Sequence, residues 1–202
     1  MKIEAVMRLA PVIPVLVIDA VAQAGPIAEA LVAGGLPALE VTLRTPAALD
    51  VIREMSKIKG AVVGAGTVLN PRDLDAAQAA GARFIVSPGL TEPLARAAID
   101  RDIPFLPGIA NAGDIMRGLD LGLDRFKFFP AEASGGLKAL QALSAPFGAV
   151  RFCPTGGITL ETAAAWLALS SVLCVGGSWL VGPTDTVDQI REKAAAAVKR
   201  LG

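Results

Sequence analysis

The 202-residue sequence contains no histidine and no tyrosine. Without histidine, the chain cannot use a histidine general base, a Ser-His triad or the usual histidine-containing zinc site. Any proton transfer must therefore be carried out by Lys, Asp, Glu or water. A surplus of positive charge is also lacking, because 19 basic residues are balanced by 19 acidic ones and no basic run occurs. We therefore expect no nucleic-acid partner.

Cysteine is nearly absent. The only two, Cys153 and Cys174, lie in apolar runs that are typical of strands. In such a context cysteine behaves as a small buried hydrophobe, and a framework of disulfides is not expected. This use of cysteine indicates a reducing compartment, so we expect a cytoplasmic protein.

One long stretch, residues 162–184, carries no charge and would be long enough to span a bilayer. Polar and glycine interruptions break it at Ser170-Ser171 and Gly176-Gly177-Ser178, and its flanks, Glu161 and Asp185, are acidic rather than basic. A helix followed by a buried strand explains the stretch better, so we expect no membrane partner. The first ten residues lack the apolar core of a signal peptide and predict a short helix instead.

Apolar strand-like runs alternate with helix-like segments along the chain, which is the pattern of βα units. Strands are expected at 12–18, 38–43, 62–67, 84–87, 105–109, the run around Lys127, 151–155 and 172–175. Eight such units predict an α/β fold of the (β/α)8 TIM barrel type, a single domain over residues 1–202 whose short N-terminal helix covers one mouth. An open doubly wound sheet is the competing fold, but the glycine-rich fingerprint that usually follows its first strand is lacking.

Helix starts are predicted from capping residues. Asp19 is expected to cap a helix that runs to Ala33, and Thr45 to cap a helix over 46–58. Asn70-Pro71 combines a capping residue with a first-position proline and is expected to open the helix after the third strand. Further helices are expected after Thr91-Glu92-Pro93, at 160–169 and at 187–200.

Lys127 lies within the aromatic run Phe126-Lys127-Phe128-Phe129, which predicts a buried strand that ends at Pro130. Lysine is almost never buried unless it has a partner or a function. Burial disfavours the ammonium form and frees the amine lone pair, which a Schiff-base nucleophile needs. The alternative is a strand lysine whose ammonium reaches solvent at one end of the sheet.

Glu40 is the clearest companion to Lys127, because it is the only one of the 19 acidic residues that lies inside a strand-like apolar run, Ala38-Leu39-Glu40-Val41. A lone buried carboxylate would be costly, whereas one opposite an ammonium is tolerable. The pair fits an amine nucleophile with its proton carrier, and the alternative is a structural ion pair. At the ends of the second, third and seventh strands stand Arg44, a candidate carboxylate clamp, and the hydroxyls of Thr42, Thr67 and Thr155.

Two glycine pairs follow the last two predicted strands. Gly156-Gly157 comes after the seventh, and Gly176-Gly177-Ser178 after the eighth. Loops at these two places form the usual phosphate site of a (β/α)8 barrel, and glycine lets backbone N–H groups approach an anion closely. We therefore expect Gly156, Gly157, Gly177 and Ser178 to bind phosphate. Gly34-Gly35 and Gly135-Gly136 are interpreted as turns.

Seven segments of the chain, in order and over nearly its whole length, resemble motifs of the 2-keto-3-deoxy-6-phosphogluconate (KDPG) aldolase family, whose members often also cleave 4-hydroxy-2-oxoglutarate (KHG). The segments are Val32-Ala33-Gly34-Gly35, Glu40-Val41-Thr42-Leu43-Arg44-Thr45, Val63-Gly64-Ala65-Gly66-Thr67-Val68-Leu69-Asn70, Ser87-Pro88-Gly89-Leu90-Thr91-Glu92-Pro93, Phe126-Lys127-Phe128-Phe129-Pro130-Ala131-Glu132, Arg151-Phe152-Cys153-Pro154-Thr155-Gly156-Gly157 and Gly176-Gly177-Ser178-Trp179.

The resemblance implies a class I aldolase, an aldehyde-lyase in which Lys127 forms the Schiff base and Glu40 transfers the proton. It implies that the keto acid and the rest of the substrate are contacted by Arg44, Thr67, Pro88, Phe129 and Thr155. It further implies a homotrimer that works in the Entner–Doudoroff pathway of carbohydrate metabolism.

The implied reaction is reversible cleavage of KDPG to pyruvate and glyceraldehyde 3-phosphate, and of KHG to pyruvate and glyoxylate. The substrate is a small, phosphorylated keto acid, and the chemistry requires no metal and no organic cofactor. Three alternatives stay open at this point: an aldolase for the galactonate isomer of KDPG, a sugar-phosphate epimerase on the same barrel, and a catalytically inactive barrel that serves binding or assembly.

Overall fold

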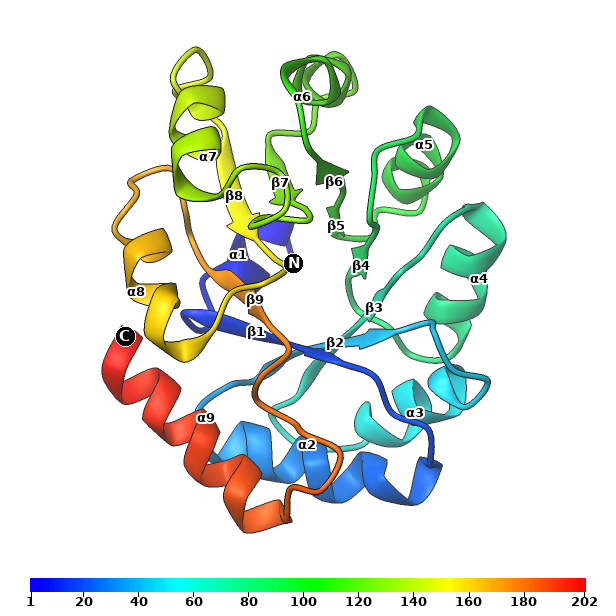
Figure 1. The fold of residues 1–202 in the computed structure, drawn as a ribbon. Coiled ribbons are helices and arrows are strands. Elements are labelled where there is room, and N and C mark those ends of the chain that lie inside the picture. The colour runs from blue at the N-terminus through cyan, green and yellow to red at the C-terminus, as the bar shows by residue number, and fades with distance from the viewer.

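Residues 1–202 are all described in a computed structural model, in which strands and helices alternate along most of the chain (Figure 1). The strands are β1 (Val12–Leu16), β2 (Ala38–Thr42), β3 (Val62–Gly66), β4 (Ile85–Val86), β5 (Phe105–Leu106), β6 (Gly108–Ile109), β7 (Arg125–Phe128), β8 (Arg151–Pro154) and β9 (Val175–Gly177). The helices are α1 (Ile3–Met7), the 3-10 turn η1 (Val21–Gln23), α2 (Ala24–Ala33), α3 (Ala48–Met55), α4 (Pro71–Ala79), α5 (Glu92–Asp100), α6 (Ala112–Asp120), α7 (Gly136–Ser144), α8 (Leu160–Leu167) and α9 (Val187–Leu201).

All strand pairs are parallel, and helices α2 to α9 surround the strands (Figure 1). One sheet has six strands in the order β5-β4-β3-β2-β1-β9, and a second has three in the order β6-β7-β8. Isolated parallel bridges join Phe152 to Val172 and Thr155 to Gly176, between β8 and the segment that carries β9. The α/β class of the predicted (β/α)8 fold is thus confirmed, with a curled parallel sheet, while the hydrogen-bonded ladder is divided into two parts.

The predicted strand at 105–109 is divided by Pro107, which has no N–H to donate to a ladder. The Pro107 carbonyl still accepts a hydrogen bond from the Lys127 N–H at 2.9 Å. The last strand begins at Val175, three positions later than the predicted start at Val172. Between the bridges Phe152–Val172 and Thr155–Gly176, the segment that leads into β9 has one residue more than β8. An extra residue of this kind is a bulge, and it interrupts the ladder.

Helix caps are predicted with mixed success. Asn70 is confirmed, because its side chain accepts a hydrogen bond from the Asp73 N–H at the start of α4. The prediction for Asp19 is wrong, because α2 begins only at Ala24, after η1. The prediction for Thr45 is also wrong: its hydroxyl donates to the Ile18 carbonyl at 2.7 Å, and so ties the end of β2 to the end of β1.

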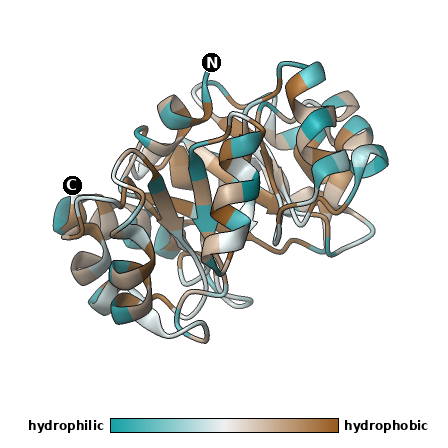
Figure 2. Cartoon of the chain, turned by 90° about the horizontal axis from the view of Figure 1, so that it is seen from above, coloured by the Kyte–Doolittle hydropathy of each residue, from teal (hydrophilic) through white to brown (hydrophobic).

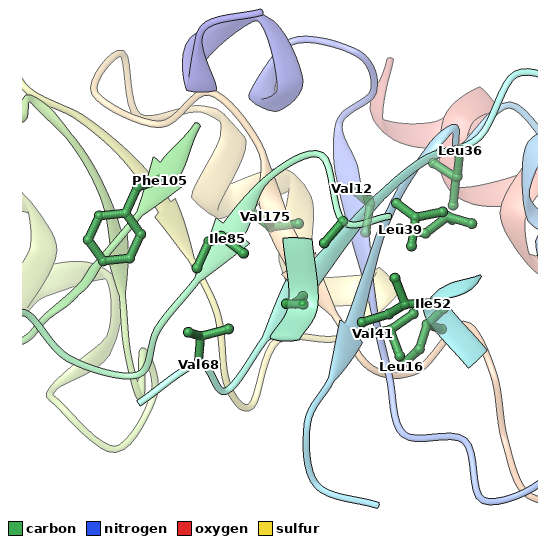
Figure 3. Packing of buried hydrophobic residues seen from close by; sticks show 14 of the residues in the cluster. Val12, Leu16, Leu36, Leu39, Val41, Ile52, Val68, Ile85, Phe105 and Val175 are labelled. Carbon is green, nitrogen blue, oxygen red and sulfur yellow. The ribbon is translucent and has the colours of Figure 1, made fainter. Parts of the chain in front are cut away.

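The main core fills the space between the strands and the surrounding helices, whose inner faces are hydrophobic (Figure 2). Val12 of β1 pairs in register with Val175 of β9, and both are fully buried (Figure 3). Leu39 and Val41 of β2 belong to the same cluster as Ile52 of α3 (Figure 3). Burial of each such aliphatic side chain contributes about 1.5–3 kcal/mol to folding.

The short helix α1 closes one end of the ring of strands. Its Val6 and Met7 are fully buried in a second, smaller apolar cluster together with side chains of the strands. Glu4 of α1 forms an ion pair of 2.7 Å with Arg125, the first residue of β7, so α1 lies at the N-terminal ends of the strands. This confirms the predicted short N-terminal helix and leaves the C-terminal ends of the strands to the candidate site.

The charge-free stretch 162–184 contains most of α8, a connecting loop and β9, as its composition predicts. Among all the helices, none combines the length and the apolar character that crossing a bilayer requires.

Candidate active site

Two ionisable side chains meet inside the ring of strands. Lys127 of β7 donates a hydrogen bond from Nζ to Oε1 of Glu40 on β2, over 3.1 Å. Both residues are almost completely buried, at 5% and 3% exposure. The predicted pairing of an amine with a carboxylate is therefore found. Such a pair can hold a proton at either group and can present an amine to an electrophile.

An aromatic ring lies on another side of the amine. The Lys127 Nζ is 5.1 Å from the centre of the Phe129 ring, a distance at which the ring face attracts a cation. Phe129 follows β7, and its N–H donates to the Ile109 carbonyl at 3.1 Å. The same side chain adjoins the loop after β8, since a methyl group added to Gly156 would lie 3.5 Å from the Phe129 ring. Phe129 therefore connects the amine to the first glycine pair.

Arg44 and Thr67 also lie together. The Arg44 Nε donates to the Thr67 hydroxyl over 3.2 Å, which brings the ends of β2 and β3 to one point. Thr67 adopts a positive φ of 58°, a conformation that is unfavourable for a β-branched residue. Strained backbone of this kind persists where the surroundings fix it, as at ligand sites. This strain is a site feature that the sequence did not reveal.

Thr155 follows β8 directly and is 6% exposed. Its N–H donates to the Phe128 carbonyl at 2.9 Å, and its carbonyl accepts from the Ala131 N–H at 2.8 Å. These bonds fasten the loop after β7 to the end of β8. The Thr155 side chain lies over Gly176, where a methyl group would come within 2.2 Å of the hydroxyl oxygen.

The two glycine pairs have different structural reasons for glycine. Gly156 and Gly157 both have positive φ, at 107° and 79°, so a turn of this shape favours glycine. Gly177 has an ordinary φ but lies against the indole ring of Trp179, which a methyl group at Gly177 would approach to 2.5 Å. The N–H groups of Gly157 and Ser178 donate no hydrogen bond within the chain. They are available to an anion at the ends of β8 and β9.

Pro88 is exposed and follows β4. Its carbonyl packs on Gly108, where a methyl group would lie 2.1 Å from the carbonyl oxygen. Gly108 is the register partner of Lys127, which places Pro88 beside the strand that neighbours the lysine.

The remaining thiols and carboxylates offer no metal site, since no three His, Cys, Asp or Glu side chains are grouped to ligate an ion. Cys153 and Cys174 are free and buried, as predicted. A hydrogen bond with Cys153, together with burial, raises the pKa of the Cys174 thiol well above its usual range. A thiol of this kind stays protonated and inert at neutral pH.

Comparison with known proteins gives consistent results. Residues 3–201 match the family model of KDPG and KHG aldolase. The 2-dehydro-3-deoxy-phosphogluconate aldolase of Zymomonas mobilis is 60% identical over 202 residues, which cover 98% of this chain and 97% of the relative. The crystal structure of the KDPG aldolase of Zymomonas mobilis ZM4 with 3-phosphoglycerate superposes with a TM-score of 0.95, at 60% identity, covering 97% of this chain and 94% of that one.

A second crystal structure is that of the KDPG aldolase of Legionella pneumophila, with pyruvate captured at low pH as a covalent carbinolamine intermediate. It superposes with a TM-score of 0.94 at 44% identity, covering 98% of each chain. The family model matches nearly the whole chain, and the relatives are 44–60% identical over almost their full length. The chain belongs to the KDPG and KHG aldolase family.

Proposed function

We propose that this protein is a class I aldolase, a lyase that cleaves KDPG reversibly to pyruvate and glyceraldehyde 3-phosphate through a Schiff base on Lys127. The observation that carries the proposal is the buried contact of 3.1 Å between the Lys127 amine and the Glu40 carboxylate. A relative with the same family membership holds pyruvate as a carbinolamine, the adduct that precedes such a Schiff base.

The reaction begins when the Lys127 amine attacks the C2 ketone of the substrate. The carbinolamine loses water and becomes an iminium, whose C=N bond accepts the electron pair of the carbon–carbon bond that breaks. The aldehyde leaves, and the enamine is protonated at C3 and hydrolysed to pyruvate. The iminium is itself the electron sink, so this route asks for no metal and no organic cofactor.

Glu40 moves the protons in this scheme. Its Oε1 lies within hydrogen-bond distance of the nitrogen that becomes the carbinolamine and then the iminium. A carboxylate in this place can take a proton from the attacking amine and from the C4 hydroxyl, directly or through one water, and return one to C3. The competing interpretation as a structural ion pair predicts a large loss of stability without a comparable loss of chemistry.

The substrate's two ends are assigned to opposite sides of the amine. Arg44 and Thr67 meet at the ends of β2 and β3 and are placed to bind the keto-acid carboxylate. Phe129, Thr155 and Pro88 line the middle of the substrate.

Phosphate is assigned to the glycine pairs after β8 and β9, that is, to Gly156, Gly157, Gly177 and Ser178. The free N–H groups of Gly157 and Ser178 support this assignment. The Zymomonas mobilis relative is described with 3-phosphoglycerate, a phosphorylated ligand.

The architecture is proposed to be one closed (β/α)8 barrel, a single domain over residues 1–202. The bridges between β8 and the β9 segment, and the continuity of the chain from β5 to β6, support closure. We further propose a homotrimer that works in the cytoplasm, in the Entner–Doudoroff pathway. The exposed apolar side chains that support self-association include Val17, Leu69 and Met116.

The function is tested by measuring pyruvate release from four keto acids: KDPG, its galactonate isomer, KHG, and the unphosphorylated form of KDPG. We expect rapid release from KDPG, slower release from KHG, and none from any substrate after Lys127→Met. Interconversion of KDPG and its galactonate isomer without pyruvate release would favour the epimerase, and equal turnover of both isomers would overturn the gluconate assignment. No activity on any of the four would favour the binding barrel.

A further inference from the structure

Gly66, the last residue of β3, lies against the Glu40 side chain. A methyl group at Gly66 would lie 2.2 Å from Glu40 Oε1, 2.7 Å from Cγ and 2.8 Å from Cδ. Contacts of a real Cβ are essentially never below 3.0 Å, so the outer half of the glutamate would have to move. The oxygen at 2.2 Å is the same Oε1 that accepts the hydrogen bond from Lys127.

Backbone conformation does not account for glycine at this position. Gly66 is absent from the residues with positive φ and pairs regularly with Thr42 in the ladder between β2 and β3. Any L-residue can adopt such an extended backbone. What glycine provides here is therefore space, since a strand-interior glycine is also found where another group approaches closely.

Glu40 has little freedom to give way. It is 3% exposed, and Lys127 holds its Oε1 from the side facing β7. Its register partner on β3 is Gly64, so the side chain leans one step along the strands to lie over Gly66. In a close-packed interior, a displaced Glu40 carboxylate would lie at a different distance from the Lys127 amine or would lose its hydrogen bond to it.

Gly64 provides an internal comparison, because it lies on the same strand and the same face, two residues earlier. A methyl group there would meet the Phe84 ring at 2.4 Å. Phe84 belongs to the small apolar cluster that also contains Val6 and Met7 of α1. The two glycines thus leave the same kind of space, one for a carboxylate and one for a core side chain.

We propose that Gly66 is a positioning residue for proton transfer, whose missing side chain fixes the Glu40 carboxylate against Lys127. The inference rests on the proposed role of Glu40 as proton carrier. It assigns to β3 a part in the chemistry through the space that Gly66 leaves rather than through a side chain of its own.

The test compares Gly66→Ala with Gly64→Ala. In Gly66→Ala, borohydride should still trap pyruvate on Lys127, whereas exchange of the pyruvate C3 protons with solvent should fall about 10²-fold, as expected for a displacement near 1 Å. Gly64→Ala should lower the melting temperature by a similar amount but keep exchange within a few-fold of wild type. Wild-type exchange in Gly66→Ala, or equal loss in both variants, would overturn the inference.

A double-mutant comparison keeps the inference testable even if Gly66→Ala folds poorly. Removing the glutamate side chain removes the collision, so Gly66→Ala should lower the melting temperature in the wild-type background and leave it unchanged in the Glu40→Ala background. Equal losses in both backgrounds would show that the space belongs to something else. If wild type neither traps pyruvate nor exchanges its protons, the proposed function fails, and the melting comparison still decides whether Gly66 seats Glu40.

Discussion

The Nζ of Lys127 lies 3.1 Å from Oε1 of Glu40, although the two residues are 87 positions apart in the chain. The contact crosses the ring from β7 to β2 and is almost completely buried. Burial of two charges is tolerated only when they are paired, and removal of one partner from such a pair typically costs about 3–5 kcal/mol of stability. The contact therefore needs to be explained by function or by structure, and the two explanations predict different variants.

Glu40→Gln separates these explanations. Glutamine matches glutamate in shape and can still hydrogen-bond Lys127, but it cannot carry a proton. If Glu40 is the proton carrier, kcat should fall by ~10²–10⁴-fold, about 3–5 kcal/mol of barrier, while the melting temperature changes little. A variant that keeps wild-type exchange of the pyruvate C3 protons would refute the role, whatever its stability.

Ser178→Asp tests the phosphate assignment. Gly177 is less suitable for this purpose, because any side chain there meets the Trp179 ring and would disturb packing. Ser178 is exposed, and a carboxylate within about 4 Å of a phosphate costs about 1–4 kcal/mol. We expect KM for KDPG to rise roughly tenfold and KM for unphosphorylated KHG to change little.

Ser170→Asp is the matched control for this test, because Ser170 is also exposed but precedes β9, whereas Ser178 follows it. It should leave both KM values unchanged. Equal increases for the two substrates in Ser178→Asp would place the phosphate elsewhere.

The link between α1 and β7 predicts how stability depends on pH. Hydrogen bonds from Arg125, and then from Arg8, lower the pKa of Glu4 below its usual value of 4.5. A carboxyl whose pKa is lowered by folding stabilises the protein above its unfolded pKa, and that contribution disappears as the pH falls through the folded pKa. We expect Glu4→Gln to lower the melting temperature near pH 7 and to converge with wild type below about pH 4.

Glu29→Gln is the control for the pH experiment, because Glu29 of α2 is exposed and forms no ion pair. Its melting curve should follow wild type across the range. A constant difference between Glu4→Gln and wild type from neutral to acid pH would mean that the ion pairs of Glu4 do not stabilise the protein.

Metal independence is predicted from the chemistry of the iminium and from a chain without histidine. Activity should survive prolonged incubation with a chelator. Loss of activity on chelation, with recovery after a divalent cation is added, would show that the reaction needs a Lewis acid.

The Lys127–Glu40 contact was predictable because apolar runs with a single charge stand out in a sequence without histidine. The Asn70 cap is also predictable from local sequence, because the capping residue and the proline that follows it are adjacent. Thr45 was misassigned because its hydroxyl bonds a carbonyl 27 positions away, which local patterns do not encode. The space that Gly66 leaves for the Glu40 side chain depends on the register between β2 and β3. It can therefore be recognised only once the pairing of these strands is known.

Helices α6 and α7 are not expected from the sequence pattern, although each carries a local signal. Asn111 accepts a hydrogen bond from the Asp114 N–H and caps α6, and Gly135 with a φ of 104° precedes α7. The sequence favours a turn at the glycine pair 135–136, but only Gly135 lies in a turn, because Gly136 is already the first residue of α7. The cap at Asn111 is followed by Gly113 rather than by strong helix formers, which weakens the sequence pattern.

The central claim is that Lys127 forms a Schiff base with the keto acid, and borohydride reduction in the presence of pyruvate tests it most directly. The iminium is reducible, so peptide mapping by mass spectrometry should find one reduced pyruvyl group per chain, on Lys127, with loss of activity in proportion to labelling. The remaining lysines, including Lys138 on helix α7, should stay unlabelled. A label on any of these, or no label at all with pyruvate in excess, would contradict the account.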